Sequence, residues 1–195
     1  MKVGIACLVA GYVLSQFYRA FLAVLAPALT AELGASAADL ARASAWWFLA
    51  FAAMQVPVGW ALDRIGPRRL AAGLLGVAGT AGAGLVAAAQ GPGAVTLGMA
   101  LIGIGCSPVL MAGYYIFARA FPAAMFGTLA GAMLGAGTLG NLAASLPLAL
   151  AAEAWGWRGT VAVLAVATAA VAGLVWRFVI DPPPPPAAPA GAGGI

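Results

Sequence analysis

The sequence contains no histidine and very few charged residues, with nine Lys or Arg and five Asp or Glu among 195. The absence of histidine excludes a Ser-His or Cys-His catalytic pair, a His-ligated zinc site and an axial haem histidine. Charged residues make up 7% of the chain and apolar residues 64%. Soluble domains have roughly 25% charged and about 45–50% apolar residues. The composition therefore excludes an ordinary soluble fold.

Cysteine is also scarce, and both residues, Cys7 and Cys106, lie inside apolar runs. Free cysteine in such surroundings behaves as a small hydrophobic residue. Neither neighbourhood offers further ligands, so we expect no disulfide, no metal site and no cofactor. An intramembrane enzyme is disfavoured, because the apolar runs hold no acid and no loop resembles a phosphate cradle. Nothing in the composition suggests a nucleic-acid partner.

What the chain does contain is a series of long apolar segments separated by polar residues, glycine and proline. Because they are continuously apolar rather than alternating, they favour helices over the strands of a β-barrel. A membrane span needs about 20 such residues. The sequence predicts an all-α integral membrane domain of six transmembrane helices over residues 1–180. The segments cover residues 3–29, 39–62, 70–89, 94–118, 124–151 and 158–179.

The end of the chain differs from the rest, because residues 181–195 contain five consecutive prolines followed by Ala, Pro and Gly. Such a composition is typical of a disordered tail or linker. We therefore predict that this stretch is disordered.

The positive residues predict the orientation of the six spans. The side that would hold both termini carries six of them, the opposite side carries two, and Arg19 lies within the first span. Cytoplasmic segments are enriched in Lys and Arg. We therefore expect an inner (plasma) membrane protein with both termini in the cytoplasm.

The loop between the second and third spans, residues 59–69, reads GWALDRIGPRR and is called the signature loop below. It resembles the loop of the major facilitator superfamily, in which Gly, Asp-Arg, Gly and a basic pair occur in this order. Pro67 is the one departure. The resemblance extends over residues 1 to about 180 and implies one half of a twelve-span transporter fold. The matching positions are Gly59, Asp63, Arg64, Gly66, Arg68 and Arg69.

Asp63 ends a predicted helix, where the helix dipole disfavours a negative charge. It therefore needs a positive partner, and Arg119 at the cytoplasmic end of the fourth span is the natural one. In the family, this loop bridges the two halves and locks the outward-facing state. The resemblance thus assigns a conformational switch to the signature loop and Arg119.

A half-size chain implies a partner, because a polar cavity wall facing lipid is unfavourable. Three arrangements stay open: a homodimer, a pair with a separate second-half chain, or a truncated product. In the last case the chain is a non-transporting membrane or accessory protein. The family arrangement predicts that spans two and five form the pairing surface.

Arg19 is the main candidate for a substrate-binding residue, since a charge near the middle of a span costs at least about 2.5–3.5 kcal/mol. Tyr12 and Gln16 share its helix face, and no span holds an acid to act as its counter-ion. An anionic solute, either a carboxylate or a phosphate ester, is the expected partner. A structural alternative is that Arg19 extends toward the membrane surface or binds a carbonyl group.

Further polar or aromatic residues inside the spans are candidates for the same cavity, although such residues also hold helices together. Two motifs of drug/proton antiporters are missing, which disfavours drug efflux. No span holds the acid or histidine that usually couples transport to protons. The additional candidates are Trp47, Gln55, Tyr114, Tyr115 and Asn141.

Overall fold

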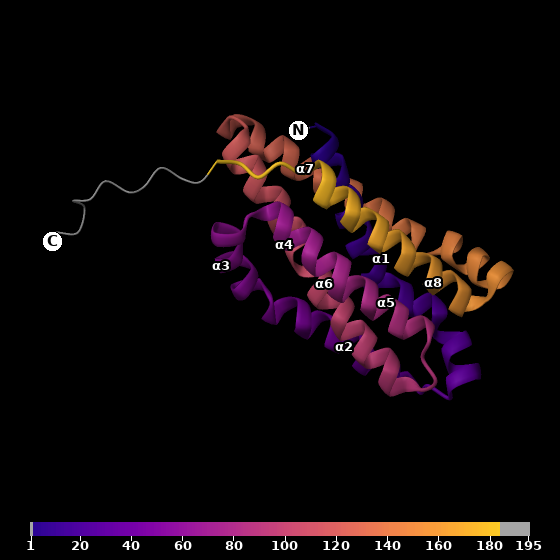
Figure 1. Cartoon of the computed structure of the whole chain (residues 1–195). Coiled ribbons are helices and arrows are strands. Elements are labelled where there is room, and N and C mark those ends of the chain that lie inside the picture. Colours follow the sequence, from indigo (N-terminus) through magenta and orange to yellow (C-terminus); the bar gives the residue numbers. More distant parts are fainter. Residues whose placement is uncertain (1, 184–195) are drawn as a thin grey trace.

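The apolar segments form long helices in the computed structural model, which describes residues 2–183 (Figure 1). Residues 184–195 of the predicted disordered tail lie outside the described residues. The helices are α1 (Lys2–Leu33), α2 (Ala37–Ala53), α3 (Gln55–Ile65), α4 (Pro67–Leu74), the π-helix η1 (Leu75–Gly79), α5 (Thr80–Ala87), α6 (Pro92–Ala120), α7 (Ala123–Ala143) and α8 (Leu146–Phe178).

Five helical stretches are long and apolar enough to cross a membrane, and the pair α2–α3 makes a sixth if it counts as one bent span. The stretch from Pro67 to Ala87 joins α4, η1 and α5 into one of them. The all-helical, six-span prediction is therefore confirmed for the part of the chain that the structure describes.

Two of the predicted spans are interrupted, and a proline follows each interruption. The axes of α2 and α3 meet at 43°, and α2 ends at Ala53, four residues before Pro57. Similarly, α7 ends at Ala143, four residues before Pro147. A proline ring clashes with the carbonyl group four residues earlier and removes one hydrogen bond. The fifth predicted span, 124–151, is consequently divided between α7 and the start of α8.

Local signals define two further helix ends. Ser36 and Asp39 form a capping box in which each side chain accepts a hydrogen bond from the other residue's backbone amide at the start of α2. Gly156 has φ = 72°, and its positive φ produces a kink inside α8. The last span therefore begins after Gly156.

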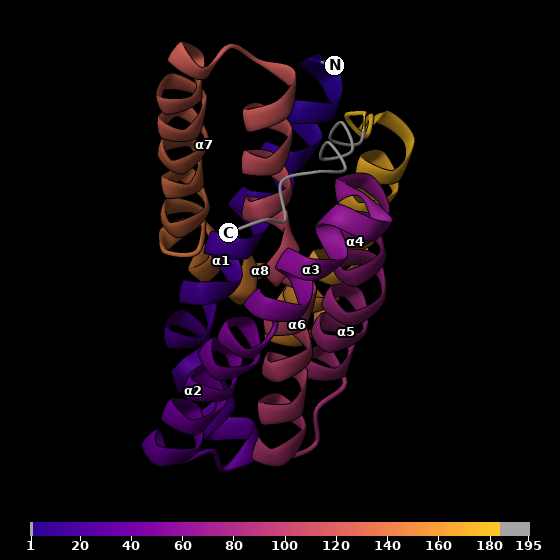
Figure 2. The ribbon, with the colours of Figure 1, turned by 90° about the vertical axis from the view of Figure 1, so that its left-hand side faces the viewer.

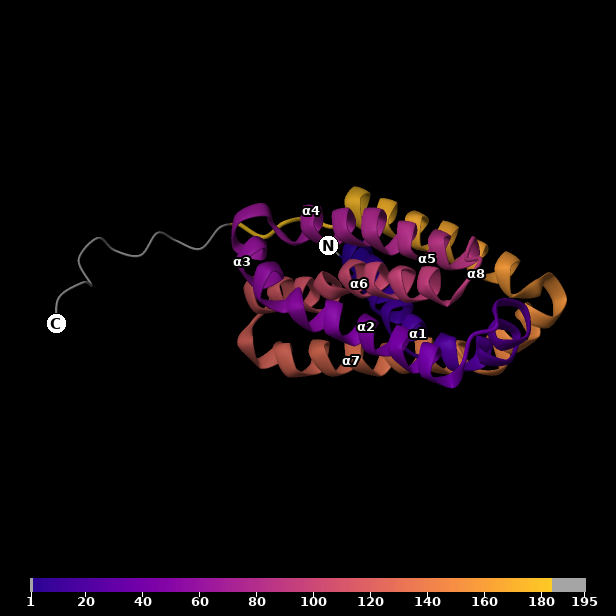
Figure 3. The ribbon, with the colours of Figure 1, turned by 90° about the horizontal axis from the view of Figure 1, so that it is seen from below.

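The helices form three layers (Figure 3). One layer holds α4, α5 and α8, the middle layer holds α1 and α6, and the opposite layer holds α2 and α7. In Figure 2, α7 lies at the edge of the bundle, and it packs mainly on α1. The two ends of the described chain lie together, since Gly4 packs against the backbone of Phe178 and Val179.

Glycines allow some of these helices to approach closely. A Cβ atom at Gly82 would meet the backbone of α6, and one at Gly140 would meet the carbonyl oxygen of Val13 in α1. The regularly spaced Gly127, Gly131 and Gly135 of α7 have open space instead. The face of α7 that packs closely on α1 is therefore the one that carries Gly140. The face that carries the three regularly spaced glycines does not pack closely on another described helix.

Candidate functional site

A cavity of about 130 Å³ lies between α1, α2 and α6. Three of the sequence candidates on α1 line it together with Trp47 of α2. The helical spacing of 12, 16 and 19 places the α1 residues on one face, as the sequence predicts. The lining residues are Tyr12, Ser15, Gln16, Arg19, Trp47, Phe51 and Leu110.

The Arg19 guanidinium is held by one weak hydrogen bond and by aromatic rings. Its Nη1 donates to Gln16 Oε1 at 3.4 Å, and Gln16 Nε2 donates to the Tyr12 hydroxyl at 2.5 Å. The guanidinium carbon lies 5.7 Å from the ring centroid of Trp47 and 5.1 Å from that of Phe48. Such cation–π contacts favour a positive charge without neutralising it.

No acid faces this cavity. The acidic residues Glu32, Asp39, Asp63, Glu153 and Asp181 all lie near helix ends or breaks. Over residues 2–183, none of them forms a salt bridge with Arg19. Among the described residues, Arg19 therefore has no acidic partner.

The buried indole of Trp47 is a second unpaired group in the lining. Its side chain is 2% exposed, and Nε1 has no hydrogen-bond partner in the described part of the chain. Buried donors of this kind are normally satisfied. The Nε1 atom has almost no accessible surface, however, so among the described residues it is Arg19 that offers the cavity a positive charge suited to an anionic acceptor.

Four sequence candidates lie outside the lining of this cavity. Gln55 donates to the Phe51 carbonyl of its own span at 3.0 Å. Tyr114 packs against Phe126 at the start of α7, with ring centroids 5.7 Å apart. Tyr115 lies against the guanidinium of Arg119, and Asn141 is exposed on α7.

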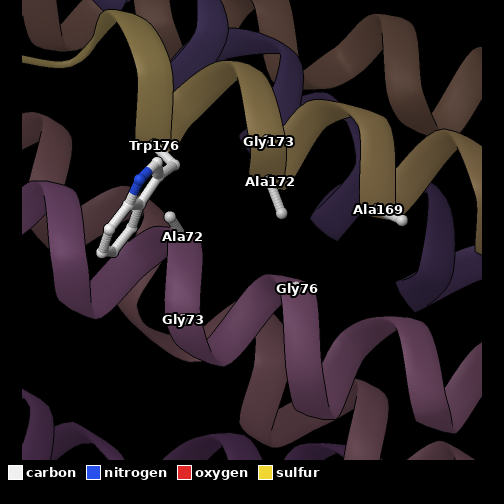
Figure 4. A pocket seen from close by; sticks show the side chains of 7 residues that line it. All are labelled: Ala72, Gly73, Gly76, Ala169, Ala172, Gly173 and Trp176. Carbon is white, nitrogen blue, oxygen red and sulfur yellow. The ribbon is translucent and has the colours of Figure 1, made fainter.

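A second hollow, of about 240 Å³, lies in the opposite layer between the α4–η1 stretch and α8 (Figure 4). Glycine and alanine line it, and Trp176 closes one end. None of its lining residues is charged. Unlike that of the Arg19 cavity, its lining offers no group that would hold an anion.

Two charged residues of the signature loop, Asp63 and Arg68, lie in ion pairs. Arg119 Nη2 donates to Asp63 Oδ1 at 3.2 Å, which is the partnership that the sequence predicts. Arg64 lies over the ring of Trp60 at 4.2 Å, and Arg69 is exposed.

The described fold requires glycine at Gly66 of this loop but not at Gly59. A Cβ atom at Gly59 would make only an ordinary van der Waals contact, 3.6 Å from the end of the Met111 side chain in α6. Gly66 joins α3 to α4 with φ = 88°, a conformation that non-glycine residues rarely adopt.

Asp181 is a member of this cluster that sequence reasoning missed. Its Oδ1 accepts a hydrogen bond from the backbone N–H of Arg68 at 2.7 Å, and its Oδ2 lies 3.9 Å from Arg68 Nε. A Cβ atom at Gly66 would lie within 2.9–3.1 Å of the same carboxyl group. The signal was available, since α4 begins at Gly66-Pro67 without a local side-chain cap and its free amides need an acceptor.

Comparisons with known proteins agree with this architecture. The sequence profile described as the Major Facilitator Superfamily matches residues 8–194. A search of curated proteins found no match.

Two solved structures share the fold. The POT family transporter PepTSo aligns with a TM-score of 0.74 and 18% identity, over 95% of this chain and 40% of its own. The xylose transporter XylE from E. coli, in an inward-open conformation, aligns with a TM-score of 0.73 and 20% identity, over 92% of this chain and 48% of its own. The chain thus spans less than half the length of these proteins, as a six-span half of the fold does. From the extent of the profile match and the six-span architecture, we conclude that this chain is an integral membrane protein that belongs to the major facilitator superfamily.

Proposed function

We propose that the chain is one six-helix half of a transporter that moves a small anionic solute, a carboxylate or a phosphate ester, by alternating access. The observation that carries this proposal is Arg19, a cation near the middle of α1 that lines a cavity and has no acidic partner in the described chain. A charge at this depth is costly unless it has a function or a partner. A transported anion supplies the partner.

A second six-helix half completes the site in this proposal. The cavity is built from the middle layer and from α2, on the side opposite the α4–α5–α8 layer. Without a cover on that side, Arg19 would be exposed to lipid, which is unfavourable. The partner is either a second copy of this chain or a separate chain that provides the other half, with α2–α3 and α7 at the interface.

The transport proposal is tested by reconstituting the purified chain into vesicles. Uptake of labelled succinate and glycerol 3-phosphate should exceed that of protein-free vesicles, and Arg19→Ala should reduce it to background. Arg42→Ala is the matched control, because Arg42 is exposed at the start of α2 and pairs with Asp39. Equal uptake by Arg19→Ala and the unmodified chain would show that the site assignment is wrong.

The particle mass in detergent separates the forms of the partner. A dimer with uptake supports a homodimeric transporter. A monomer without uptake favours a chain that needs a separate half or acts as a non-transporting membrane protein. Co-expression with a candidate second-half chain distinguishes these two, since only the former gains uptake.

The proposed cytoplasmic location of both termini is tested with single introduced cysteines. The native Cys7 and Cys106 are both buried, so the background of labelling is low. Gly34 follows the last residue of α1 and Ala123 is the first residue of α7, and both are exposed. The α1–α2 and α6–α7 connections lie at opposite ends of the bundle (Figure 2). In intact cells, a membrane-impermeant maleimide should label Gly34→Cys and leave Ala123→Cys unlabelled. The reverse pattern would invert the orientation.

A further inference from the structure

The hollow between the α4–η1 stretch and α8 lies in the layer opposite the Arg19 cavity (Figure 3, Figure 4). In the proposed arrangement, the second half covers α2–α3 and α7, so the hollow faces lipid. We propose that it holds an acyl chain of an anionic phospholipid, whose headgroup binds Arg69 and Arg177. This inference uses the proposed arrangement of the two halves but not the anion site at Arg19.

The hollow is present because both of its walls contain glycine. A Cβ atom at Gly73 of α4 or at Gly173 of α8 would meet no atom of a neighbouring helix within 4 Å. Where the two helices do touch, a Cβ atom at Gly76 would lie 3.2 Å from that of Ala172. The rest of the lining consists of alanine and Trp176. An apolar recess that faces the bilayer is filled by hydrocarbon, because no water is present at that depth. The hollow therefore suits a lipid chain.

The lining itself is uncharged, but each of the two helices carries an arginine just beyond it. Arg69 and Arg177 each lie four residues from a lining glycine, and this spacing places them on the same helix face as that glycine. The start of α4 lies beside the end of α8, since the backbone N–H of Arg68 donates to Asp181. The two arginines therefore flank the same end of the hollow.

Neither of these arginines is neutralised in the described chain. Over residues 2–183, no salt bridge involves Arg69 or Arg177, and both are exposed. The guanidinium carbon of Arg177 lies 5.3 Å from the ring centroid of Phe178, a contact that leaves the charge in place. In the proposed orientation this end is cytoplasmic, and basic pockets between helices on that side bind anionic headgroups. A lipid phosphate would supply a counter-ion to both arginines.

Trp176 marks the headgroup level at this end. Its side chain closes the hollow (Figure 4) and is 52% exposed. Tryptophan rings gather at the interface between membrane and water. Arg68 packs on this ring, with its guanidinium carbon 5.5 Å from the ring centroid, and is itself paired with Asp181. The apolar recess, the interfacial ring and the two arginines thus follow the order of chain, glycerol region and phosphate in a phospholipid.

The test measures lipid binding to the purified chain in detergent by native mass spectrometry, which counts the lipids on each particle. The probes are phosphatidylglycerol, phosphatidylcholine with the same acyl chains, and free glycerol 3-phosphate. We expect phosphatidylglycerol to bind about tenfold to thirtyfold more tightly than phosphatidylcholine, because two arginines favour the anionic headgroup. Glycerol 3-phosphate lacks the chains, so any binding of it should not depend on Arg69 or Arg177.

The first set of variants tests the charges. Arg69→Gln and Arg177→Gln should each weaken the binding of phosphatidylglycerol by about fivefold and leave that of phosphatidylcholine unchanged. Arg64→Gln is the matched control, because it removes the same charge from an exposed position three residues before the start of α4. Arg64 is outside the lining and lies against Trp60, so its removal should have little effect.

The second set of variants tests the hollow. Gly73→Leu and Gly173→Leu place a side chain in open space, so they fill the hollow without a clash. Each should weaken the binding of both phospholipids by about twofold to fivefold, since the acyl chain loses several packing contacts. Gly84→Leu is the control, because Gly84 also faces open space. It lies about 20 Å along the helix from Arg69, beyond the depth of one leaflet, which is about 15 Å.

The outcomes separate a lipid site from its alternatives. Equal binding of the two phospholipids, or an equal loss in Arg64→Gln and Arg69→Gln, would show that no specific headgroup site exists. Unchanged binding in both leucine variants of the hollow would place the lipid elsewhere. A change of the particle from dimer to monomer in Gly73→Leu would assign this face to a second copy of the chain. Arg19→Ala should leave lipid binding unchanged, so failure of the transport proposal and failure of this inference are distinguishable.

Discussion

The Arg19 cavity and the signature loop both contain arginine, but they differ in what balances its charge. In the loop, Arg119 pairs with Asp63 and Arg68 pairs with Asp181. In the cavity, Arg19 contacts an amide oxygen and two aromatic rings. Paired charges of the first kind hold segments of the chain together. The unpaired charge of the second kind leaves its strongest interaction to a group from outside the chain.

The largest effect, on anion binding, is expected from placing an acid beside Arg19, so that its charge is paired as the charges of Arg119 and Arg68 are. Leu110→Glu would place a carboxylate in the lining, where it pairs with Arg19 and competes with any bound anion. Binding of succinate or other small anions should weaken by about 100-fold or more, because two hydrogen bonds to a charged group are replaced. Calorimetric titration and vesicle uptake both measure this.

Leu110→Gln is the control for that experiment, since it has a similar shape and adds no charge. It should weaken anion binding much less than Leu110→Glu. If the two variants bind anions equally, Arg19 is not the group that holds the anion, and the contrast between the two regions has no functional meaning.

The second largest effect, on stability, is expected where Gly66 of the signature loop packs against the carboxyl group of Asp181. Gly66→Ala places a side chain at φ = 88° and against the carboxyl group of Asp181. The strained conformation alone costs about 1–3 kcal/mol, and displacing the carboxylate adds to it. Thermal unfolding in detergent should show a clear decrease in the midpoint temperature.

Gly73→Ala is the matched comparison, because Gly73 lies in helix α4 with open space around its Cα. There, alanine should stabilise the helix by about 0.5–1 kcal/mol. In an Asp181→Ala background, Gly66→Ala should cost less, since only the backbone strain remains. A loss of the same size in both backgrounds would show that Asp181 does not pack on this turn.

Much of the helical architecture was predictable from apolar runs, whereas the breaks were less so. Pro57 and Pro147 follow interruptions, but Pro27 and Pro108 lie inside continuous helices. Whether a proline breaks a helix depends on how neighbouring helices satisfy the freed carbonyl groups. That is a property of the packed bundle, and a single sequence does not reveal it.

The candidate site was partly predictable for a similar reason. Periodicity on one helix placed Tyr12, Gln16 and Arg19 together, because residues four and three apart share a face. Which residues of α2 and α6 meet that face depends on tertiary packing, so Phe51 and Leu110 were not predicted. Asp181, which reaches a loop 113 residues earlier in the chain, was interpreted from its proline-rich neighbourhood instead of from the uncapped helix that it serves.

The smallest effect on stability is expected from the pair that resembles a switch. Asp63 is 62% exposed and Arg119 is 26% exposed, and pairs at the surface contribute between about 0 and 1 kcal/mol. Asp63→Asn should therefore leave the midpoint of thermal unfolding almost unchanged.

Loss of up to 1 kcal/mol nevertheless shifts an equilibrium between two conformations by up to about fivefold. If the loop locks one state of the transporter, the uptake rate should change while stability does not. The charge exchange Asp63→Arg with Arg119→Asp should restore part of the rate, and a large loss of stability without a change in rate would assign the pair to the fold alone. A weak pair is what such a lock requires, because an interaction that opens in every transport cycle must be easily broken.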